Sequence, residues 1–255
     1  MNLSIVIPCY NETQNVSLIG ERLFPVMEEL SCTWLIQIVL VNDGSTDDTL
    51  DRLNDLAADR PDVQVVSHAQ NRGLGAAMRT GFAHARSQSD VVVTTDSDGT
   101  YPFAEIPLIL EHLTPDVEVV TASPYHPQGG VEGVPPYRLV LSQGASLLYR
   151  ILLDWHVHTY TSMFRAYRRE VVECVPSKAN GFLMPAEFLA NAILMGYRVA
   201  EFPTVLHVRQ YGQSKARVAR VILAHLRFQA GLVWRRLLRA YREPAEGVRP
   251  TRQGE

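Results

Sequence analysis

Residues 91–99 read VVVTTDSDG, an apolar run of strand length that ends in two aspartates and a glycine. Alternate residues at a strand end bent by Gly99 can direct the carboxylates of Asp96 and Asp98 to one point. Two carboxylates this close repel each other unless a cation lies between them, and such hard oxygen ligands suit Mg²⁺ or Mn²⁺. The alternative is a solvated acidic turn, because aspartate is common in turns.

Further apolar runs of strand length, rich in β-branched residues, accompany this one in the first half of the chain. They span residues 3–8, 37–41, 63–67 and 117–122, and helical patterns span residues 15–30, 46–58, 74–85 and 103–113. Strands that are apolar on both faces and alternate with helices predict an α/β fold, in which a mostly parallel sheet is flanked by helices.

A stretch rich in proline and glycine, residues 123–137, interrupts this alternation and predicts a long loop. Long loops in compact domains are usually functional. The pattern then resumes with a helix, a strand, a helix and a strand at residues 139–153, 164–167, 185–195 and 198–202.

Length and composition are typical of one globular α/β domain. The chain has 255 residues, of which 46% are apolar and 20% charged, and this excludes disordered and collagen-like classes. Cys9, Cys32 and Cys174 lie far apart without metal-ligand spacing, which is typical of reduced thiols in a reducing compartment. The sequence has neither a signal-peptide pattern nor an apolar stretch of about 20 residues, so we expect a cytoplasmic protein that is not integral to a membrane.

Basic residues concentrate near the C-terminus. No acidic residue lies between Glu201 and Glu243, although the chain as a whole has a net charge of -3. The basic residues of this window are Arg209, Lys215, Arg217, Arg220, Arg227, Arg235, Arg236, Arg239 and Arg242. Such a charge asymmetry predicts a polyanionic partner, either phosphates or an anionic membrane surface.

The same segment has the pattern of a basic amphipathic helix at residues 216–242. One face of this helix is apolar and consists of Val218, Ile222, Leu226, Val233, Leu237 and Tyr241. With Trp234 at its flank, the helix suits an anionic interface on the cytoplasmic face of a membrane, and a helix packed on the domain is the alternative. We therefore expect a globular domain at residues 1–215, this helix, and a frayed tail at residues 243–255.

Polar residues follow each predicted strand, at the sheet edge where α/β folds bind ligands. Tyr10, Asn11 and Glu12 follow the first strand, and residues 42–47 (NDGSTD) follow the second. Thr46 and Asp47 fit the capped start of the next helix, whereas Asp43 lies before the cap and needs another role.

Residues 71–77 (NRGLGAA) resemble a phosphate loop, but Met78 stands where a dinucleotide fingerprint has its third glycine. We interpret this stretch as a tight turn that leads into a closely packed helix.

Four segments occur in one order: VIPCYNE at 6–12, NDGSTD at 42–47, NRGLG at 71–75 and DSDG at 96–99. Together they resemble family 2 glycosyltransferases of the GT-A fold, which is Rossmann-like. Later segments resemble the polyprenyl-phosphate members of that family, such as dolichol-phosphate mannosyltransferases. These segments are GGVEG at 129–133 with Arg138, SQGA at 142–145, TSMFRAYR at 161–168 and RQYGQSK at 209–215.

This resemblance, which covers about residues 3–215, implies roles for the matching residues. It implies inverting transfer of a hexose from a nucleotide-diphosphate sugar, either GDP-mannose or UDP-glucose, to a polyprenyl phosphate. The nucleoside would be held by Pro8, Tyr10, Glu12 and Asp43. The metal ion, Mg²⁺ or Mn²⁺, and the donor diphosphate would be bound by Asp96 and Asp98, and the phosphates would be covered by Arg209 and Lys215.

The chain also departs from the family pattern. Asn42 stands where an aspartate is frequent, and Thr100 stands where a glutamine is frequent, so a third protein ligand to the metal stays open. Thr159 and Met163 replace a common aspartate and a usual glycine, and both bear on the acceptor site.

The acceptor decides which side chains the reaction needs. A phosphate monoester is mostly dianionic at neutral pH, because its second pKa is about 6, so it needs cations rather than a base. Arg138 and Arg150 are candidates for binding that phosphate, together with Arg209 and Lys215. A sugar hydroxyl would need a base, for which Glu187 is the candidate, although Glu187 could equally hold the donor sugar or an arginine. We therefore expect Asp98, Glu187 and Arg209 to be catalytic.

Two other classes of protein compete with this interpretation. Nucleotidyltransferases share a similar fold and a metal aspartate, but they usually have a glycine-rich basic loop where this chain has CYNE at residues 9–12. A non-catalytic sugar or nucleic-acid binder would not need Asp96 and Asp98 at a strand end. We therefore expect an enzyme without a nucleic-acid partner.

Overall fold

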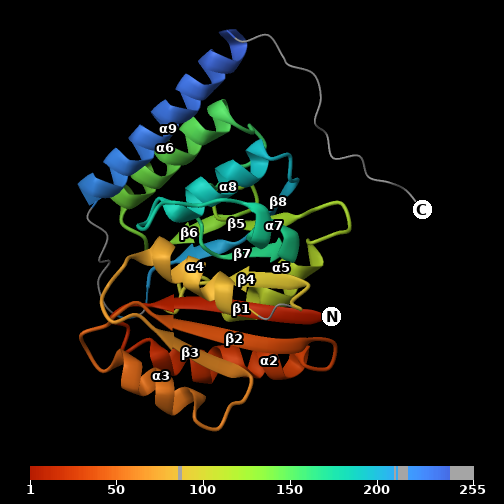
Figure 1. Ribbon diagram of the computed structural model, residues 1–255, viewed down its shortest axis with the longest axis vertical. Helices are drawn as coiled ribbons and strands as arrows, with labels where there is room; N and C mark the ends of the chain where they lie inside the picture. The colour runs from red at the N-terminus through yellow and green to blue at the C-terminus, as the bar shows by residue number, and fades with distance from the viewer. Residues whose placement is uncertain (86–87, 210, 212–217, 242–255) are drawn as a thin grey trace.

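The computed structural model describes residues 1–85, 88–209, 211 and 218–241, without the side chains of Arg138 and residues 235–241. Within these residues, a seven-stranded sheet forms the centre of the molecule (Figure 1). Its strands lie in the order β3 (Val63–Ser67), β2 (Leu35–Asn42), β1 (Asn2–Cys9), β4 (Val91–Thr94), β7 (Arg165–Arg168), β5 (Val119–Ser123) and β8 (Val199–Pro203).

Most neighbours in this sheet are parallel. β1, β2, β3 and β4 run in one direction, β5 and β8 are parallel to each other, and β7 is antiparallel to β4 and to β5. The predicted α/β fold with a mostly parallel sheet is therefore confirmed.

Helices cover both faces of the sheet because the strands are apolar on both sides. The helix expected at 15–30 consists of α1 (Val16–Leu18), the π-helical turn η1 (Ile19–Leu23) and α2 (Phe24–Leu30). The other flanking helices are α3 (Thr49–Ala57), α4 (Leu74–His84), the 3₁₀ turn η2 (Phe103–Glu105), α5 (Ile106–Glu111), α7 (Arg169–Cys174) and α8 (Met184–Leu194).

Alternate side chains of β1 enter different parts of the core. Ile5 and Ile7 pack in the cluster that contains Leu18 and Leu23, whereas Val6 packs in a cluster with Ala77 of α4. Gly81 makes the close approach of α4 possible, because a Cβ at this position would lie 2.1 Å from Cγ1 of Val6. This contact packs α4 against β1 and β2.

The long loop expected at residues 123–137 contains a short strand that the sequence does not reveal. β6 (Gly130–Glu132) pairs in parallel with β9 (Val205–His207), with Gly130 opposite Val205. Three-residue strands are too short to show an alternating pattern, so sequence periodicity could not predict them. The pair ties this loop to the segment that carries Arg209.

Two long helices, α6 (Pro136–Leu152) and α9 (Val218–Tyr241), lie side by side at one end of the molecule (Figure 1). α9 buries His225, Gln229 and Leu232. Nδ1 of His225 lies 3.0 Å from the hydroxyl of Tyr149, and Nε2 of Gln229 donates to the carbonyl of Ala145 at 3.1 Å.

The predicted helix is therefore confirmed, and its predicted apolar face is partly exposed, because Val218, Leu226 and Val233 are 40–50% exposed. The contact with α6 includes two polar side chains, His225 and Gln229, that the sequence did not single out. The side chains of Leu237 and Tyr241 lie outside the described residues. In the described part of the chain, no helix combines the length and the hydropathy of a membrane span.

Candidate active site

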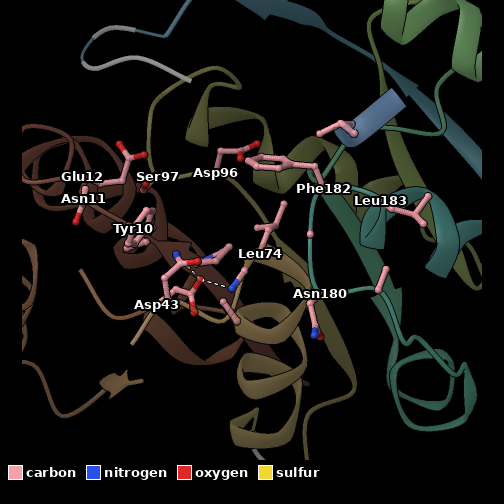
Figure 2. A pocket seen from close by; sticks show the side chains of 18 of the residues that line it. Tyr10, Asn11, Glu12, Asp43, Leu74, Asp96, Ser97, Asn180, Phe182 and Leu183 are labelled. Carbon is pink, nitrogen blue, oxygen red and sulfur yellow. Dashed lines mark hydrogen bonds between the residues drawn. The ribbon is translucent and has the colours of Figure 1, made fainter. Parts of the chain in front are cut away.

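A cavity of about 930 Å³ lies at the carboxyl ends of β1, β2 and β4, the edge where the sequence predicts the site (Figure 2). Loops from distant parts of the sequence meet there. The predicted site residues that line it are Pro8, Tyr10, Glu12, Asp43, Asp96, Asp98 and Arg209. The structure thus brings together most of the residues expected to bind the donor.

Asp96 and Asp98 form the acidic centre of this cavity. Asp98 is buried, its Oδ2 lies 2.8 Å from Nη2 of Arg209, and its Oδ1 accepts hydrogen bonds from the amide (3.0 Å) and the hydroxyl of Thr100. Burial and the neighbouring charge of Asp98 raise the pKa of Asp96 to about 8, although Arg209 opposes this shift. The raised pKa indicates that a second negative charge beside Asp98 is unfavourable here unless a cation compensates it.

Asp96 and Asp98 are the candidate ligands for a divalent cation in this cavity. The described residues contain no cluster of three or more His, Cys, Asp or Glu side chains that could hold a metal ion. Mg²⁺ is commonly held in this way, by one or two carboxylates, with substrate phosphates and water as the other ligands. Thr100, which stands where a metal-binding glutamine was considered, hydrogen-bonds to Asp98.

The loop after β1 is joined to the loop after β2 through Asn11. Asn11 has a φ of 52°, its amide donates to Oγ of Ser45 at 2.9 Å, and its Oδ1 accepts from the amide of Thr46 at 2.8 Å. The amide of Glu12 donates to Oγ1 of Thr49 at 2.8 Å. These bonds hold Tyr10 and Glu12 on one wall of the cavity (Figure 2).

Asp43 has a structural role that explains its place at the strand end. Its carboxylate accepts hydrogen bonds from the amides of Arg72 (2.9 Å) and Gly73 (2.8 Å) and from Nδ2 of Asn71 (3.0 Å). Nδ1 of His68 lies 2.7 Å from the same carboxylate. Asp43 therefore anchors the turn at residues 71–73, as expected of a tight turn, and its contact with a nucleoside stays a prediction.

Four cations are predicted to bind phosphate, and the structure describes the side chains of two of them, Arg209 and Arg150. Arg209 lines the cavity, and Lys215 lies outside the described residues. Arg138 lies in the first turn of α6, but its side chain is outside the described residues, so its contact with an acceptor phosphate stays a prediction.

Arg150 lies near the other end of α6, about 18 Å from Arg138 along the helix axis at 1.5 Å per residue. Its Nε donates to the carbonyl of Trp155 at 3.0 Å, and its guanidinium stacks 4.3 Å from the centre of the Trp155 ring. Arg150 lines neither of the two cavities described for this chain. Its contact with an acceptor phosphate also stays a prediction.

Glu187 lines neither cavity either. Its Oε2 accepts hydrogen bonds from Oγ of Ser177 (3.0 Å) and from the amides of Lys178 (3.0 Å) and Ala179 (2.8 Å). It thus holds the loop that precedes α8, and a catalytic role stays a prediction.

A second cavity, of about 550 Å³, lies between α6 and α9 and meets the first. Apolar residues of both helices line it, including Val140, Leu148, Ile222 and Leu226. Thr159 and Met163, the two departures expected to bear on the acceptor, also line it. The residues common to both cavities are Leu74, Asp96, Phe182 and Val221.

Sequence reasoning missed several residues of the first cavity, among them Arg220 and Phe182. Arg220, assigned to the basic face of the helix, lines this cavity from the start of α9. Phe182 enters it from the loop before α8 (Figure 2). Only the packing of α9 and of this loop reveals these positions, because neither residue follows a strand.

Comparison with known proteins gives a consistent relationship. Residues 4–175 match the family described as Glycosyl transferase family 2. Polyprenol monophosphomannose synthase of Mycolicibacterium smegmatis is 34% identical over 83% of this chain and 79% of its own length. Dolichol-phosphate mannosyltransferase of Pyrococcus furiosus is 32% identical over 89% of this chain, which spans 62% of that protein. Undecaprenyl-phosphate mannosyltransferase of Micrococcus luteus is 30% identical over 84% of this chain and 87% of its own length.

The fold is similar to that of glucosyl-3-phosphoglycerate synthase from Mycobacterium tuberculosis, solved with phosphoglyceric acid. The TM-score is 0.70 at 21% identity, over 90% of this chain and 80% of that one. The same enzyme solved with Mn²⁺, uridine diphosphate and glucosyl-3-phosphoglycerate gives a TM-score of 0.67. At this identity the similarity concerns the fold alone, and it agrees with the GT-A architecture expected from the sequence.

The family match covers residues 4–175, which include Tyr10, Asp43, Asp96 and Asp98 of the first cavity but not Phe182, Arg209 or Arg220. The relatives extend the similarity over most of the remaining chain at 30–34% identity. The chain therefore belongs to glycosyltransferase family 2 and is a glycosyltransferase of the GT-A fold.

Proposed function

We propose that this enzyme transfers a hexose, mannose or glucose, from a nucleotide-diphosphate sugar to a polyprenyl phosphate, with inversion at the anomeric carbon. The observation that carries the proposal is the meeting at Asp96 of two cavities, one lined by the predicted donor-binding residues and the other by apolar side chains of α6 and α9. The three relatives, whose names specify polyprenol, dolichol-phosphate and undecaprenyl-phosphate chemistry, support the same acceptor class.

The first cavity suits the donor. Tyr10 and Glu12 lie on the wall where the nucleoside would bind, and Asp96 and Asp98 lie where its diphosphate and a divalent cation would bind. Arg209 and Arg220 are the described cations that line this cavity, and they would face the phosphates. Both a guanine nucleotide sugar, GDP-mannose, and a uracil nucleotide sugar, UDP-glucose, are candidate donors.

The second cavity suits an acceptor that is apolar except at one end. An isoprenoid chain would lie among the apolar side chains of α6 and α9, and its phosphate would reach the junction beside Asp96. Burying such a chain is favourable by about 25 cal/mol per Å² of apolar surface. A sugar acceptor with a free hydroxyl would leave this apolar lining without a partner.

In the reaction, an oxygen of the acceptor phosphate forms a bond to the anomeric carbon, while the bond from that carbon to the β-phosphate oxygen breaks. The nucleoside diphosphate leaves with the electron pair. A bound Mg²⁺ or Mn²⁺ would neutralise the charge that develops on this leaving group. Asp96 and Asp98 would hold the cation, and Arg209 would move from Asp98 to the phosphates.

The helix pair also provides a surface for contact with the membrane in which polyprenyl phosphates reside. Large apolar side chains remain exposed on both helices beyond the cavity; they are Leu147 and Ile151 of α6 and Leu223, Val233 and Trp234 of α9. Arg227 is exposed on the same helix as Trp234. Apolar and basic side chains together are typical of a peripheral helix at an anionic surface, here the cytoplasmic face.

The test is a transfer assay with purified full-length protein, Mg²⁺ or Mn²⁺, and radiolabelled GDP-mannose or UDP-glucose. Polyprenyl phosphate, unphosphorylated polyprenol and methyl mannoside serve as parallel acceptors. We expect label in the organic phase only with polyprenyl phosphate, with one donor preferred, and none after chelation of the metal. Transfer to methyl mannoside with none to polyprenyl phosphate would overturn the proposal in favour of a hydroxyl acceptor.

A further inference from the structure

The loop between α7 and α8, residues 175–183, carries an aromatic side chain to the junction of the two cavities. Phe182 is 46% exposed, and it lines both cavities together with Leu74, Asp96 and Val221. Figure 2 shows its ring extending from the loop toward Asp96. Three of the four junction residues are apolar, so the passage between the cavities has one carboxylate and apolar walls.

Charged side chains from two helices hold this loop in place. From α8, Glu187, which is 8% exposed, accepts hydrogen bonds from the amides of Lys178 (3.0 Å) and Ala179 (2.8 Å). From α4, the guanidinium of Arg79 donates to the carbonyl of Ala179 at 2.7 Å and to the side chain of Asn180. A carboxylate on one side and a guanidinium on the other thus fix consecutive peptide groups just before Phe182.

The turn before α4 is shaped to receive the same loop. The amide of Gly75 donates to the carbonyl of Asn180 at 2.7 Å. A Cβ at Gly75 would lie 2.0 Å from the carbonyl oxygen of Ala179, and one at Gly73 would lie 2.3 Å from that of Asn180. The two backbones thus lie so close together that no side chain would fit between them at Gly73 or Gly75. We infer that α4 and α8 together set the position of Phe182.

An apolar ring at the junction of the two cavities can affect the reactions of the donor sugar. A glycosyl donor whose anomeric carbon is activated can be attacked by water as well as by the acceptor, and exclusion of water suppresses the side reaction. An aromatic ring offers a large apolar face that has few torsions to immobilise. The apolar faces of a hexose present C–H groups that pack against such a ring.

We propose that Phe182 contacts the transferred hexose and excludes water from its anomeric carbon, and that Arg79 and Glu187 are positioning residues for Phe182. The inference rests on the proposed function, because it assumes that donor and acceptor meet at this junction. According to this inference, Phe182 affects the ratio of sugar transfer to donor hydrolysis and does not affect nucleotide binding.

The experiment measures two rates for each variant: release of nucleoside diphosphate without acceptor, and transfer to polyprenyl phosphate in detergent. For Phe182→Ala we expect the ratio of transfer to hydrolysis to fall roughly tenfold, which corresponds to about 1.4 kcal/mol of differential barrier. Phe182→Tyr should keep the wild-type ratio. Arg79→Met should lower the ratio in the same direction, whereas Arg60→Met, which breaks the surface pairs with Glu28 and Asp62, should leave it unchanged.

The outcomes separate this inference from the proposed function. If the wild-type protein transfers sugar to polyprenyl phosphate and Phe182→Ala keeps the wild-type ratio, the role of Phe182 is overturned. If the wild-type protein transfers no sugar to that acceptor, the proposed function itself fails. Because Phe182 is a half-exposed residue, its variant should keep the thermal midpoint of the wild-type protein, and Arg79→Met is compared with Arg60→Met at equal folded fraction.

Discussion

Nη2 of Arg209 lies 2.8 Å from Oδ2 of Asp98, so an arginine occupies the side of the carboxylate where a divalent cation would bind. The segment with β9 brings this arginine to the acidic centre, and β9 is paired to β6 in the loop at residues 123–137. Under the proposed function, we expect this ion pair to open when donor and cation bind. Arg209 would then be free to contact the donor phosphates.

Replacement of Asp98 by Asn should abolish most of the transfer activity without unfolding the protein. The amide keeps the shape of the side chain and can still accept from the amide of Thr100, but it loses the charge that holds a cation. We expect a loss of roughly 100-fold or more in turnover. The thermal midpoint should change little, because Arg209 is partly exposed and can be solvated. Near-normal turnover of Asp98→Asn would contradict the metal assignment.

Replacement of Arg209 by Met should have opposite effects on the cation and on the nucleotide. Without the competing guanidinium, Mg²⁺ should bind several-fold more tightly to the free protein, while nucleoside diphosphate should bind roughly tenfold more weakly. Calorimetry measures both affinities. The control is Arg198→Met, which removes an exposed pair with Asp116. Weaker binding of both ligands would show that the ion pair does not compete with the cation.

His225 should make the packing of α9 sensitive to acid. Burial lowers the pKa of His225 to about 4, whereas an exposed histidine has a pKa of about 6.5. The unfolded chain therefore takes up this proton first, so the stability that neutral His225 contributes is present above pH 6.5 and is lost as the pH falls toward 4. The loss amounts to roughly 3 kcal/mol, from 1.36 kcal/mol per pKa unit.

Denaturant unfolding at pH 7 and pH 4.5 measures this effect. His225→Gln cannot titrate, and it can still hydrogen-bond to Tyr149. We expect the variant to lose clearly less stability between the two pH values than the wild-type protein. Identical losses would show that His225 does not report the contact between α6 and α9.

The exposed apolar side chains of α9 should anchor the protein to anionic vesicles. We expect Leu223→Ser with Trp234→Ser to weaken vesicle binding roughly tenfold or more, because both side chains are about half or more exposed and contribute apolar area to the interface. Leu35→Ser with Leu108→Ser removes comparable exposed side chains from β2 and α5, and it should bind vesicles like the wild-type protein. Co-sedimentation at low and high salt measures the binding. Equal vesicle binding by the two double variants would show that α9 packs on the domain and does not anchor the protein to the membrane.

The sequence predicted the parts of the fold that have strong periodicity. The buried runs of β1, β2 and β4 and the polar residues that follow them were identifiable, because a parallel sheet gathers its strand ends at one edge. The pairing of β6 with β9 could not be predicted, because strands of three residues are too short to show a periodic pattern. The burial of His225 and Gln229 against α6 could not be predicted, because a helical projection does not show hydrogen-bond partners on another helix.

Part of the candidate site could also be predicted from the sequence. Asp96 and Asp98 could be found from their place after a strand, whereas the four hydrogen-bonding partners of Asp43 lie 25 to 30 residues further along the chain, at His68 and in the turn at residues 71–73. Phe182 and Arg220 carry no local signal, because tertiary packing alone brings them to the cavity.

The most direct test of the central claim is the chemical nature of the product. Phosphorus NMR of the organic-phase product, combined with mild acid hydrolysis, determines which atom of the acceptor carries the sugar. The proposed function predicts a phosphodiester with the hexose in inverted configuration, which mild acid converts into free sugar and polyprenyl phosphate. A product whose sugar is linked to a hydroxyl, stable to mild acid and without a phosphodiester signal, would contradict it.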